Sequence, residues 1–192
     1  ERGFIGIGVL GLGVVGGGLV WSLTEKADRL AARLGVPLRL TRVLVRDPDK
    51  ARLVEVPRRL LATNPLDILG DPETDVVVEV MGGEEPAHRL IREALAAGKH
   101  VVTANKEVMA KHGPQLLAMA DQHSVELRFE ASVGAGIPLI GSLGDSLAGN
   151  QLTALWAIIN GTTNYVLTRM TTEDMDFLTA LGLAQELGYA EP

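Results

Sequence analysis

The sequence predicts an α/β fold in which a doubly wound parallel sheet is followed by the beginning of a smaller α+β domain. Three observations support this prediction. A glycine-rich turn joins an apolar strand pattern to an apolar helix pattern within residues 4–23. Strand and helix patterns then alternate as far as residue 129, and beyond residue 130 this alternation stops. Alternating strands and helices form parallel sheets because each connecting helix covers one face of the sheet.

The composition of the 192 residues is that of an ordinary globular protein, with 46% hydrophobic and 22% charged residues. The formal net charge of −6 and the lack of a basic cluster argue against nucleic-acid binding. The chain contains no cysteine, which excludes disulfides and thiolate metal sites and fits a reducing, cytoplasmic environment. The apolar run at residues 4–20 is rich in glycine and has no basic flank before it, so we expect neither a signal peptide nor a membrane span.

The stretch FIGIGVLGLGVVGGG, residues 4–18, places Gly11, Gly13 and Gly16 in the G-x-G-x-x-G spacing. This spacing is typical of a turn that binds the diphosphate of a dinucleotide. The first glycine permits a tight turn, the second lets the backbone approach the diphosphate, and the third lets the helix pack on the strand. The anion would lie at the helix N-terminus, where backbone N–H groups are free. The alternative interpretation is a glycine-rich turn that binds no ligand.

The other elements of the first part follow from turn and cap residues. Gly35 and Gly98 each end an expected helix, Asn64 is an expected N-cap, and Gly82 follows an expected strand. The expected strands cover residues 4–10, 38–45, 75–81, 100–103 and 125–129, and the expected helices cover 14–34, 65–69, 86–97, 107–111 and 114–123.

We place the domain boundary so that residues 1–130 form the sheet domain and residues 131–192 begin a second domain. In the second part the pattern predicts one strand, at residues 152–159, and helices over 137–147, 165–170 and 174–187. One strand cannot form a sheet alone. We therefore expect either that the chain is a fragment or that partner chains supply the missing strands.

The tip of the second strand predicts which nicotinamide nucleotide such a fold accepts. An acidic residue there binds the 2′-hydroxyl of NAD, whereas an arginine can accept the 2′-phosphate of NADP. Arg46 comes first in this sequence, and Asp47 follows it. The pattern fits NADP and leaves NAD open, and the alternative is that these residues form only a solvated turn. Gly82, after the strand at 75–81, is expected at the same ligand-binding edge of the sheet.

Six segments of the chain together resemble homoserine dehydrogenase. They are GLGVVG, VVVEVMGG, HVVTANKEVMAKHG, RFEASVGAGIPLI, INGTTNYVLTRM and AQELGYAEP, and they occur in the family's order. The resemblance covers essentially all 192 residues. It implies a Rossmann-type domain and the interconversion of L-homoserine and L-aspartate 4-semialdehyde with NADP or NAD. That reaction lies on the biosynthetic route from aspartate to threonine, methionine and isoleucine.

The resemblance also implies roles for individual residues. Lys106, in the TANK segment, matches a lysine near the nicotinamide and the substrate, and a lysine at the end of a parallel strand can polarise a carbonyl oxygen. The alternative is a surface lysine that opens a helix. Together with Arg46 and Gly82, the expected cofactor-binding residues are Gly11, Gly13, Val14, Val15, Gly16, Thr103, Lys106 and Gly161.

Two further sets of residues carry over from the family. Thr162 and Glu191 match substrate-binding positions, with Glu191 at the amino group of homoserine. The residues that match a site for a monovalent cation, usually sodium, are Glu130, Val133, Ala135 and Ile137. A carboxylate with several carbonyl oxygens suits such an ion, and the alternative for Glu130 is an N-cap or turn carboxylate.

The chain departs from the family pattern after GYAEP. Family members continue there with aspartates that hold the substrate and a second lysine that serves proton transfer, and they form homodimers through the completed sheet. The resemblance therefore implies a homodimeric parent enzyme, and we expect the 192-residue chain alone to be inactive. The alternative is a non-catalytic fragment that binds a nicotinamide nucleotide. A different dehydrogenase of the same fold is a further alternative, against which the TANK and NGTTN segments argue.

Overall fold

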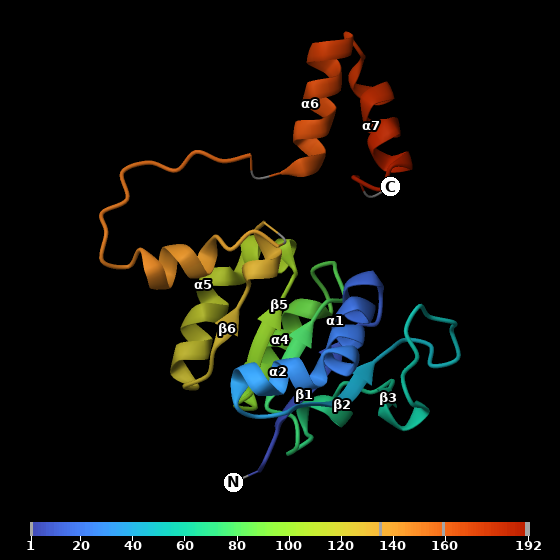
Figure 1. Cartoon of the computed structure of the whole chain (residues 1–192), viewed down its shortest axis with the longest axis vertical. Helices are drawn as coiled ribbons and strands as arrows, with labels where there is room; N and C mark the ends of the chain where they lie inside the picture. Colours follow the sequence, from blue (N-terminus) through green and yellow to red (C-terminus); the bar gives the residue numbers. More distant parts are fainter. Residues whose placement is uncertain (1, 135, 159, 191–192) are drawn as a thin grey trace. The chain divides into compact units, whose positions relative to one another are not determined.

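The computed structural model describes residues 2–134, 136–158 and 160–190 (Figure 1). The chain divides into two compact units, Glu1–Gly136 and Ile137–Pro192. Within the described residues, none of the helices has the length and apolar character needed to cross a membrane.

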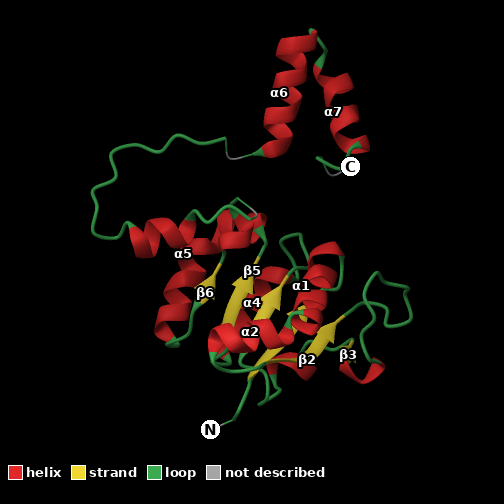
Figure 2. Ribbon diagram, in the orientation of Figure 1, coloured by secondary structure: helices red, strands yellow, loops and turns green. Residues whose placement is uncertain are grey.

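The first unit is built on a six-stranded sheet in which every neighbouring pair of strands is parallel (Figure 2). The order of strands across the sheet is β3-β2-β1-β4-β5-β6, which is the order of the Rossmann fold. The predicted fold class is therefore confirmed. The strands are β1 (Ile5–Leu10), β2 (Leu38–Leu44), β3 (Leu61–Ala62), β4 (Val76–Glu79), β5 (His100–Thr103) and β6 (Leu127–Arg128).

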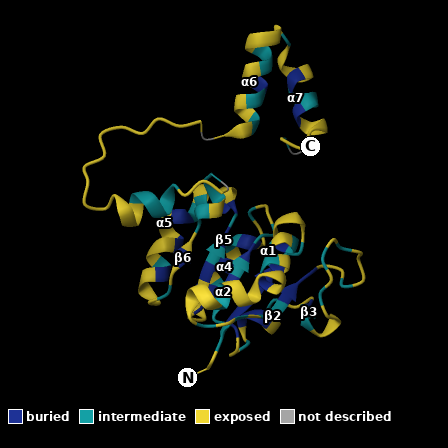
Figure 3. Cartoon of the chain, viewed as in Figure 1, coloured by how far each residue is buried: buried dark blue, intermediate teal, exposed yellow. Residues whose placement is uncertain are grey.

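Both faces of this sheet are buried. Val9 and Leu10 are neighbours in β1, and both are fully buried, but they belong to separate hydrophobic clusters. Successive residues of a strand point to opposite faces of a sheet, so each cluster lies on one face. In Figure 3 the strands are dark blue and teal, whereas the outer sides of the covering helices are largely yellow. Burial on both faces explains why the strands read as continuous apolar runs.

Two groups of helices cover these faces. The cluster that contains Val9 includes Val20 and Leu23 of the first helix. The cluster that contains Leu10 includes Leu90 and Leu116, from two later helices. The helices of the first unit are α1 (Val14–Glu25), α2 (Ala27–Leu34), α3 (Leu66–Leu69), α4 (Ala87–Ala96) and α5 (Lys106–Gln122), with short 3-10 turns at η1 (Arg58–Leu60) and η2 (Glu130–Ser132).

In the first unit the helices differ from the sequence prediction at two places. The helix expected over 14–34 is divided at Lys26 into α1 and α2. Within its last turns the Thr24 hydroxyl donates to the Val20 carbonyl at 3.0 Å, a back-bond that bends helices. The two helices expected around Pro114 are a single helix, α5. A proline inside a helix removes one backbone hydrogen bond, and burial of one face at Val108 and Leu116 offsets this loss.

The second unit contains a helical hairpin of α6 (Gly161–Glu173) and α7 (Phe177–Glu186). Its small core consists of Val166, Ala180 and Ala184. The helix expected over 137–147 has a π-helical segment, η3 (Ser142–Ser146). The strand expected over 152–159 is absent: residues 151–158 form no ladder within the described part, and Ile159 lies outside it. A strand needs a hydrogen-bonded neighbour, and the described residues of this unit supply none.

Candidate functional site

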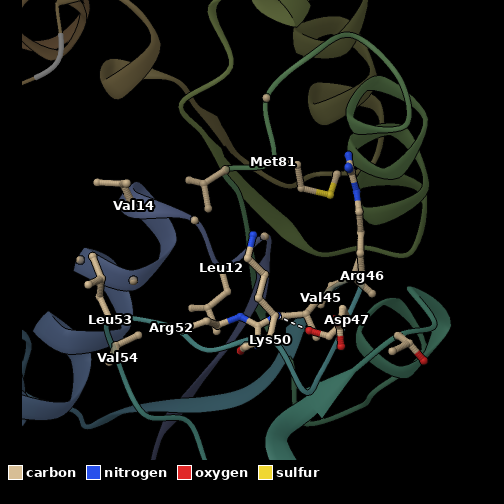
Figure 4. A pocket seen from close by; sticks show the side chains of 18 of the residues that line it. Leu12, Val14, Val45, Arg46, Asp47, Lys50, Arg52, Leu53, Val54 and Met81 are labelled. Carbon is tan, nitrogen blue, oxygen red and sulfur yellow. Dashed lines mark hydrogen bonds between the residues drawn. The ribbon is translucent and has the colours of Figure 1, made fainter. Parts of the chain in front are cut away.

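A pocket of about 1200 Å³ opens at the carboxyl ends of β1, β2 and β4 (Figure 4). We call it the sheet-edge pocket. It lies where the strand order reverses direction, between β1 and β4, and this reversal is where open α/β sheets bind ligands. Of the residues predicted to bind a cofactor, the pocket brings together Gly11, Gly13, Val14, Arg46 and Gly82.

The three glycines of the turn at the start of α1 have different surroundings. Gly11 has a φ of +105°, which disfavours any side chain. A β-carbon on Gly16 would overlap the Gly11 carbonyl oxygen. Gly13 is different, since a β-carbon there would meet no atom within 4 Å. The space beside Gly13 is open to the pocket, and Gly13 caps α1 without a side-chain hydrogen bond. The first-turn N–H groups therefore face an opening that fits an anionic diphosphate.

Val14 and Val15, the two valines of the turn, differ in their position relative to the pocket. Val14 is 83% exposed and lines the pocket, and Val15 is 59% exposed but does not line it. Gly16 is buried behind the turn. In Figure 4 Val14 lies across the pocket from Arg46.

The charged residues around the pocket are mostly cationic, although the whole chain carries a net charge of −6. Four cationic side chains and one carboxylate line it: Arg46, Lys50, Arg52, Arg89 and Asp47. A cleft lined mainly by one sign of charge attracts ligands of the opposite sign. This excess of positive charge favours an anionic ligand.

Arg46 and Asp47, which the sequence left as alternatives, have different environments. The Asp47 carboxylate accepts a hydrogen bond from the Asp49 N–H at 2.8 Å, and its backbone carbonyl accepts one from Arg52. The exposed Arg46 side chain makes no hydrogen bond or ion pair with any described residue, and it extends beside Met81 (Figure 4). Asp47 therefore holds the turn together, whereas the Arg46 guanidinium is available to a ligand.

A buried hydrogen-bond network lies under the ends of β4 and β5. Glu79 is fully buried, and its carboxyl oxygens accept from the Met81 N–H at 2.8 Å and from the Thr103 hydroxyl at 2.6 Å. The Asn105 amide group donates to the Gly83 carbonyl at 2.7 Å. Thr103, predicted to bind cofactor, is thus fully buried and bonded within the protein. Sequence reasoning did not select Glu79 or Asn105, although a carboxylate in a strand of valines was a signal.

Lys106 is the first residue of α5 and is exposed. It follows directly after Asn105, whose side chain caps the helix by accepting from the Val108 N–H at 3.1 Å. The Lys106 ammonium makes no hydrogen bond or ion pair with any described residue, and it does not line the sheet-edge pocket. The cap fixes the position at which α5 begins. It therefore also fixes the backbone position of Lys106.

A charged cluster joins the loop after β4 to the middle of α5. The Glu84 carboxylate accepts from Lys111 Nζ at 2.6 Å and interacts with His112 Nε2 at 2.8 Å. These two hydrogen bonds, that from Lys111 first, lower the pKa of Glu84 from 4.5 to about 2. Hydrogen bonds to Glu107 and Glu84 raise the pKa of Lys111. His112 also stacks on His88, with ring centroids 3.9 Å apart. The cluster ties α4 to α5.

The predicted substrate residues belong to the second unit. Gly161 and Thr162 form the first turn of α6, which Asn160 caps by accepting from the Thr163 N–H at 2.8 Å. The Thr162 hydroxyl donates to the Tyr189 carbonyl. Glu191 lies outside the described residues.

The four residues predicted to hold a monovalent cation are divided between the units. Glu130 begins η2, and its carbonyl oxygen accepts from the Val133 N–H at 3.1 Å. Ile137 belongs to the second unit and is 67% exposed. Ala135 lies outside the described residues. Nowhere in the described chain do three or more His, Cys, Asp or Glu side chains gather in a way that could hold a metal ion.

Comparison with known proteins identifies relatives for almost the whole chain. The family model described as "Homoserine dehydrogenase, NAD binding domain" matches residues 11–130, and that described as "Homoserine dehydrogenase" matches residues 138–192. The homoserine dehydrogenase of Bacillus subtilis (strain 168) is 43% identical over 187 residues, which cover 97% of this chain and 43% of that protein. The homoserine dehydrogenase of Synechocystis sp. is 48% identical over 185 residues, which cover 96% and 42%.

A solved structure of a homoserine dehydrogenase is also similar to almost the whole chain. The crystal structure of a homoserine dehydrogenase from Thiobacillus denitrificans is 45% identical, with a TM-score of 0.87, over 97% of this chain and 43% of that one. The chain therefore spans less than half the length of these relatives.

Proposed function

Because the chain belongs to the homoserine dehydrogenase family, we propose that it supplies the cofactor domain and the first part of the catalytic domain of a homoserine dehydrogenase. The resemblance inferred from the sequence motifs is confirmed, and residues 11–130 form a nicotinamide-nucleotide-binding domain. The proposed reaction interconverts L-homoserine and L-aspartate 4-semialdehyde. The proposed partition, with the cofactor domain at 1–130 and the catalytic domain from 131, is supported by family matches at 11–130 and 138–192.

The sheet-edge pocket carries the cofactor part of this proposal. Its glycine turn leaves space beside Gly13 and presents the uncapped start of α1. The diphosphate would bind there, held by backbone N–H groups. The cationic lining described above supports the same assignment.

For the nucleotide itself, we propose a preference for NADP over NAD. The exposed Arg46 guanidinium would bind the 2′-phosphate, since arginine presents a planar fork of donors that suits phosphate oxygens. The Asp47 carboxylate accepts the Asp49 N–H through one oxygen, so the proposed preference rests on Arg46 and not on any inability of Asp47 to accept a hydroxyl. The availability of the Arg46 guanidinium supports this preference.

The bound cofactor would supply the hydride chemistry, while the protein orients the substrate. In the proposed mechanism Lys106 polarises the aldehyde oxygen of the semialdehyde as negative charge develops on it. Thr162 and Glu191 would hold the substrate, with Glu191 at its ammonium group. The position of Lys106 at the start of α5, directly after β5, supports its part of this mechanism.

We also propose that Glu130, Val133, Ala135 and Ile137 contribute to a sodium site and that the complete enzyme is a cytoplasmic homodimer. A carboxylate and backbone carbonyls are hard oxygen ligands suited to such an ion. Thermal melts in NaCl and in choline chloride of equal ionic strength test the sodium site. We expect NaCl to raise the melting temperature of the wild type more than that of Glu130→Gln; equal gains would contradict the assignment.

Three measurements on the purified protein test the function. Fluorescence titration with NADPH tests the cofactor domain, and NADP⁺-dependent oxidation of L-homoserine tests the reaction, with the intact mass determined on the same sample. Binding without turnover at the mass of 192 residues would identify a cofactor-binding fragment. Turnover at that mass would show that no further lysine is needed. Failure to bind either NADPH or NADH would overturn the proposal.

A further inference from the structure

Glu79 is a fully buried carboxyl group to which the proposed function gives no role. It is the last residue of β4 and is 0% exposed. A ligand in the pocket therefore cannot touch it. Burial of such a polar group is unfavourable unless its hydrogen bonds are satisfied, and both oxygens of Glu79 are satisfied, by Met81 and Thr103.

The contacts of Glu79 continue as a directional chain of hydrogen bonds. The Thr103 hydroxyl donates to Glu79 and accepts from the Asn105 N–H at 3.0 Å. The Asn105 side chain then donates to the Gly83 carbonyl and accepts from the Val108 N–H. The chain thus runs from the end of β4 through the end of β5 to the first turn of α5, and it returns to the turn after β4.

That turn is also held at Glu84 by the charged cluster with Lys111 and His112, but the two residues before Glu84 are both glycines. Gly82 and Gly83 have φ values of +76° and +73°, and β-carbons there would meet no atom within 4 Å. Glycines in open space have wide conformational freedom. The Met81 N–H bond to Glu79 and the Gly83 carbonyl bond to Asn105 hold the two sides of this glycine pair. Met81 and Gly82 line the sheet-edge pocket, so the network sets the shape of one pocket wall.

We propose that Glu79 is a positioning residue that fixes the Met81–Gly82 wall of the pocket and the start of α5 as one unit. The inference rests on the proposed function, because the pocket is taken to bind a nicotinamide nucleotide. It adds that cofactor affinity depends on a buried carboxyl group that the cofactor cannot reach. The same network fixes the helix start from which Lys106 projects.

Matched variants test the network on the 192-residue chain. Glu79→Gln keeps the size of the side chain but replaces an acceptor oxygen with a donor. Thr103→Val removes the hydroxyl at constant shape, and Thr103→Ser restores it. The control is Thr41→Val, because Thr41 is also a buried threonine of the sheet and bonds Thr74 at 2.6 Å, away from the pocket.

The readouts are the Kd for NADPH and the melting temperature of each variant. We expect Glu79→Gln and Thr103→Val each to weaken NADPH binding by about tenfold or more, a factor that corresponds to about 1.4 kcal/mol. Thr103→Ser should bind within about threefold of the wild type, and Thr41→Val should melt lower but bind normally. The double variant Glu79→Gln/Thr103→Val should lose less than the sum of the single losses, because the two groups act as a pair.

A merely structural role would give a different result. If Glu79→Gln and Thr103→Val lowered the melting temperature as Thr41→Val does but bound NADPH like the wild type, the proposal would be wrong. If the wild type itself failed to bind NADPH, the proposed function would be wrong.

In that case the amide NMR resonances of Gly83 and Lys106 in the ligand-free chain test whether Glu79 holds the two segments. Resonances that shift in Glu79→Gln but not in Thr41→Val would support the proposed network. Unchanged resonances would overturn it.

Discussion

The carbonyl oxygen of Gly11 packs so closely against Gly16 that a β-carbon at Gly16 would overlap it. Gly11 follows the last residue of β1, and Gly16 lies in the first turn of α1. The close contact between Gly11 and Gly16 holds the first turn of α1 against the end of β1. It therefore sets the position from which the first-turn N–H groups face the pocket.

Gly16→Ala should destabilise the first unit and weaken nucleotide binding, because the turn must move to admit the methyl group. Overpacking of this kind costs about 1–3 kcal/mol. Urea unfolding measures the stability loss, and NADPH titration measures the binding loss. Gly18→Ala is the stability control: its β-carbon meets no atom within 4 Å, and alanine should stabilise the helix by about 0.5–1 kcal/mol. Equal effects of the two substitutions would contradict the close approach.

Arg46→Ala should reduce the affinity for NADPH by about tenfold or more, about 1.4 kcal/mol, and leave the affinity for NADH nearly unchanged. The reason is that only NADPH carries the 2′-phosphate that Arg46 is proposed to bind. Parallel titrations with both nucleotides give the ratio. Arg33→Ala, on the exposed side of α2, controls for the loss of one positive charge. An equal loss of NADH affinity would show that Arg46 does not act through the 2′-phosphate.

Lys106→Ala in the active enzyme should remove most turnover while NADPH affinity changes by less than about tenfold, or about 1.4 kcal/mol. Lys106 is proposed to act on the substrate oxygen, and it does not line the sheet-edge pocket. Steady-state kinetics and NADPH titration of the same preparation separate these effects. Unchanged turnover would remove Lys106 from the mechanism.

Glu84→Gln should make the chain less stable at pH 6, and this difference should shrink as the pH falls. The pKa of Glu84 is lowered from 4.5 to about 2 in the folded state. The folded state then binds fewer protons than the unfolded state between these values, so the contribution to stability is present above pH 4.5 and is lost toward pH 2. Urea unfolding at pH 6, 4 and 3 measures it. Glu55→Gln, at an exposed position, is the control, and a pH-independent difference would contradict the ion cluster.

The sequence was most informative where local chemistry dictates structure. Glycine spacing and short apolar runs predicted the turn at Gly11, the parallel strands and the sheet edge, and the fold class is confirmed. Asn64 was predicted to cap a helix; its side chain accepts from the Leu66 N–H at 3.1 Å, but the N-cap residue of α3 is Pro65. Such features depend on a few neighbouring residues, so they can be read along the chain.

Other features depend on residues far apart. Pro114 suggested a helix boundary, but burial along one face keeps α5 continuous. Residues 152–158 have the composition of a strand, yet no described strand lies beside them. The choice between Arg46 and Asp47 was open in the sequence, and the structure adds that Asp47 is hydrogen-bonded within its turn.

The sequence by itself determined the family and the position of the dinucleotide turn, because these are recorded in local spacing and composition. Only the tertiary structure decided that Glu79, Thr103 and Asn105 form one network. Glu79 and Thr103 are 24 positions apart, and they meet because β4 and β5 pair in parallel with Glu79 beside Thr103. Register between strands is a property of the folded sheet, since it follows from the packing of both faces rather than from either strand alone.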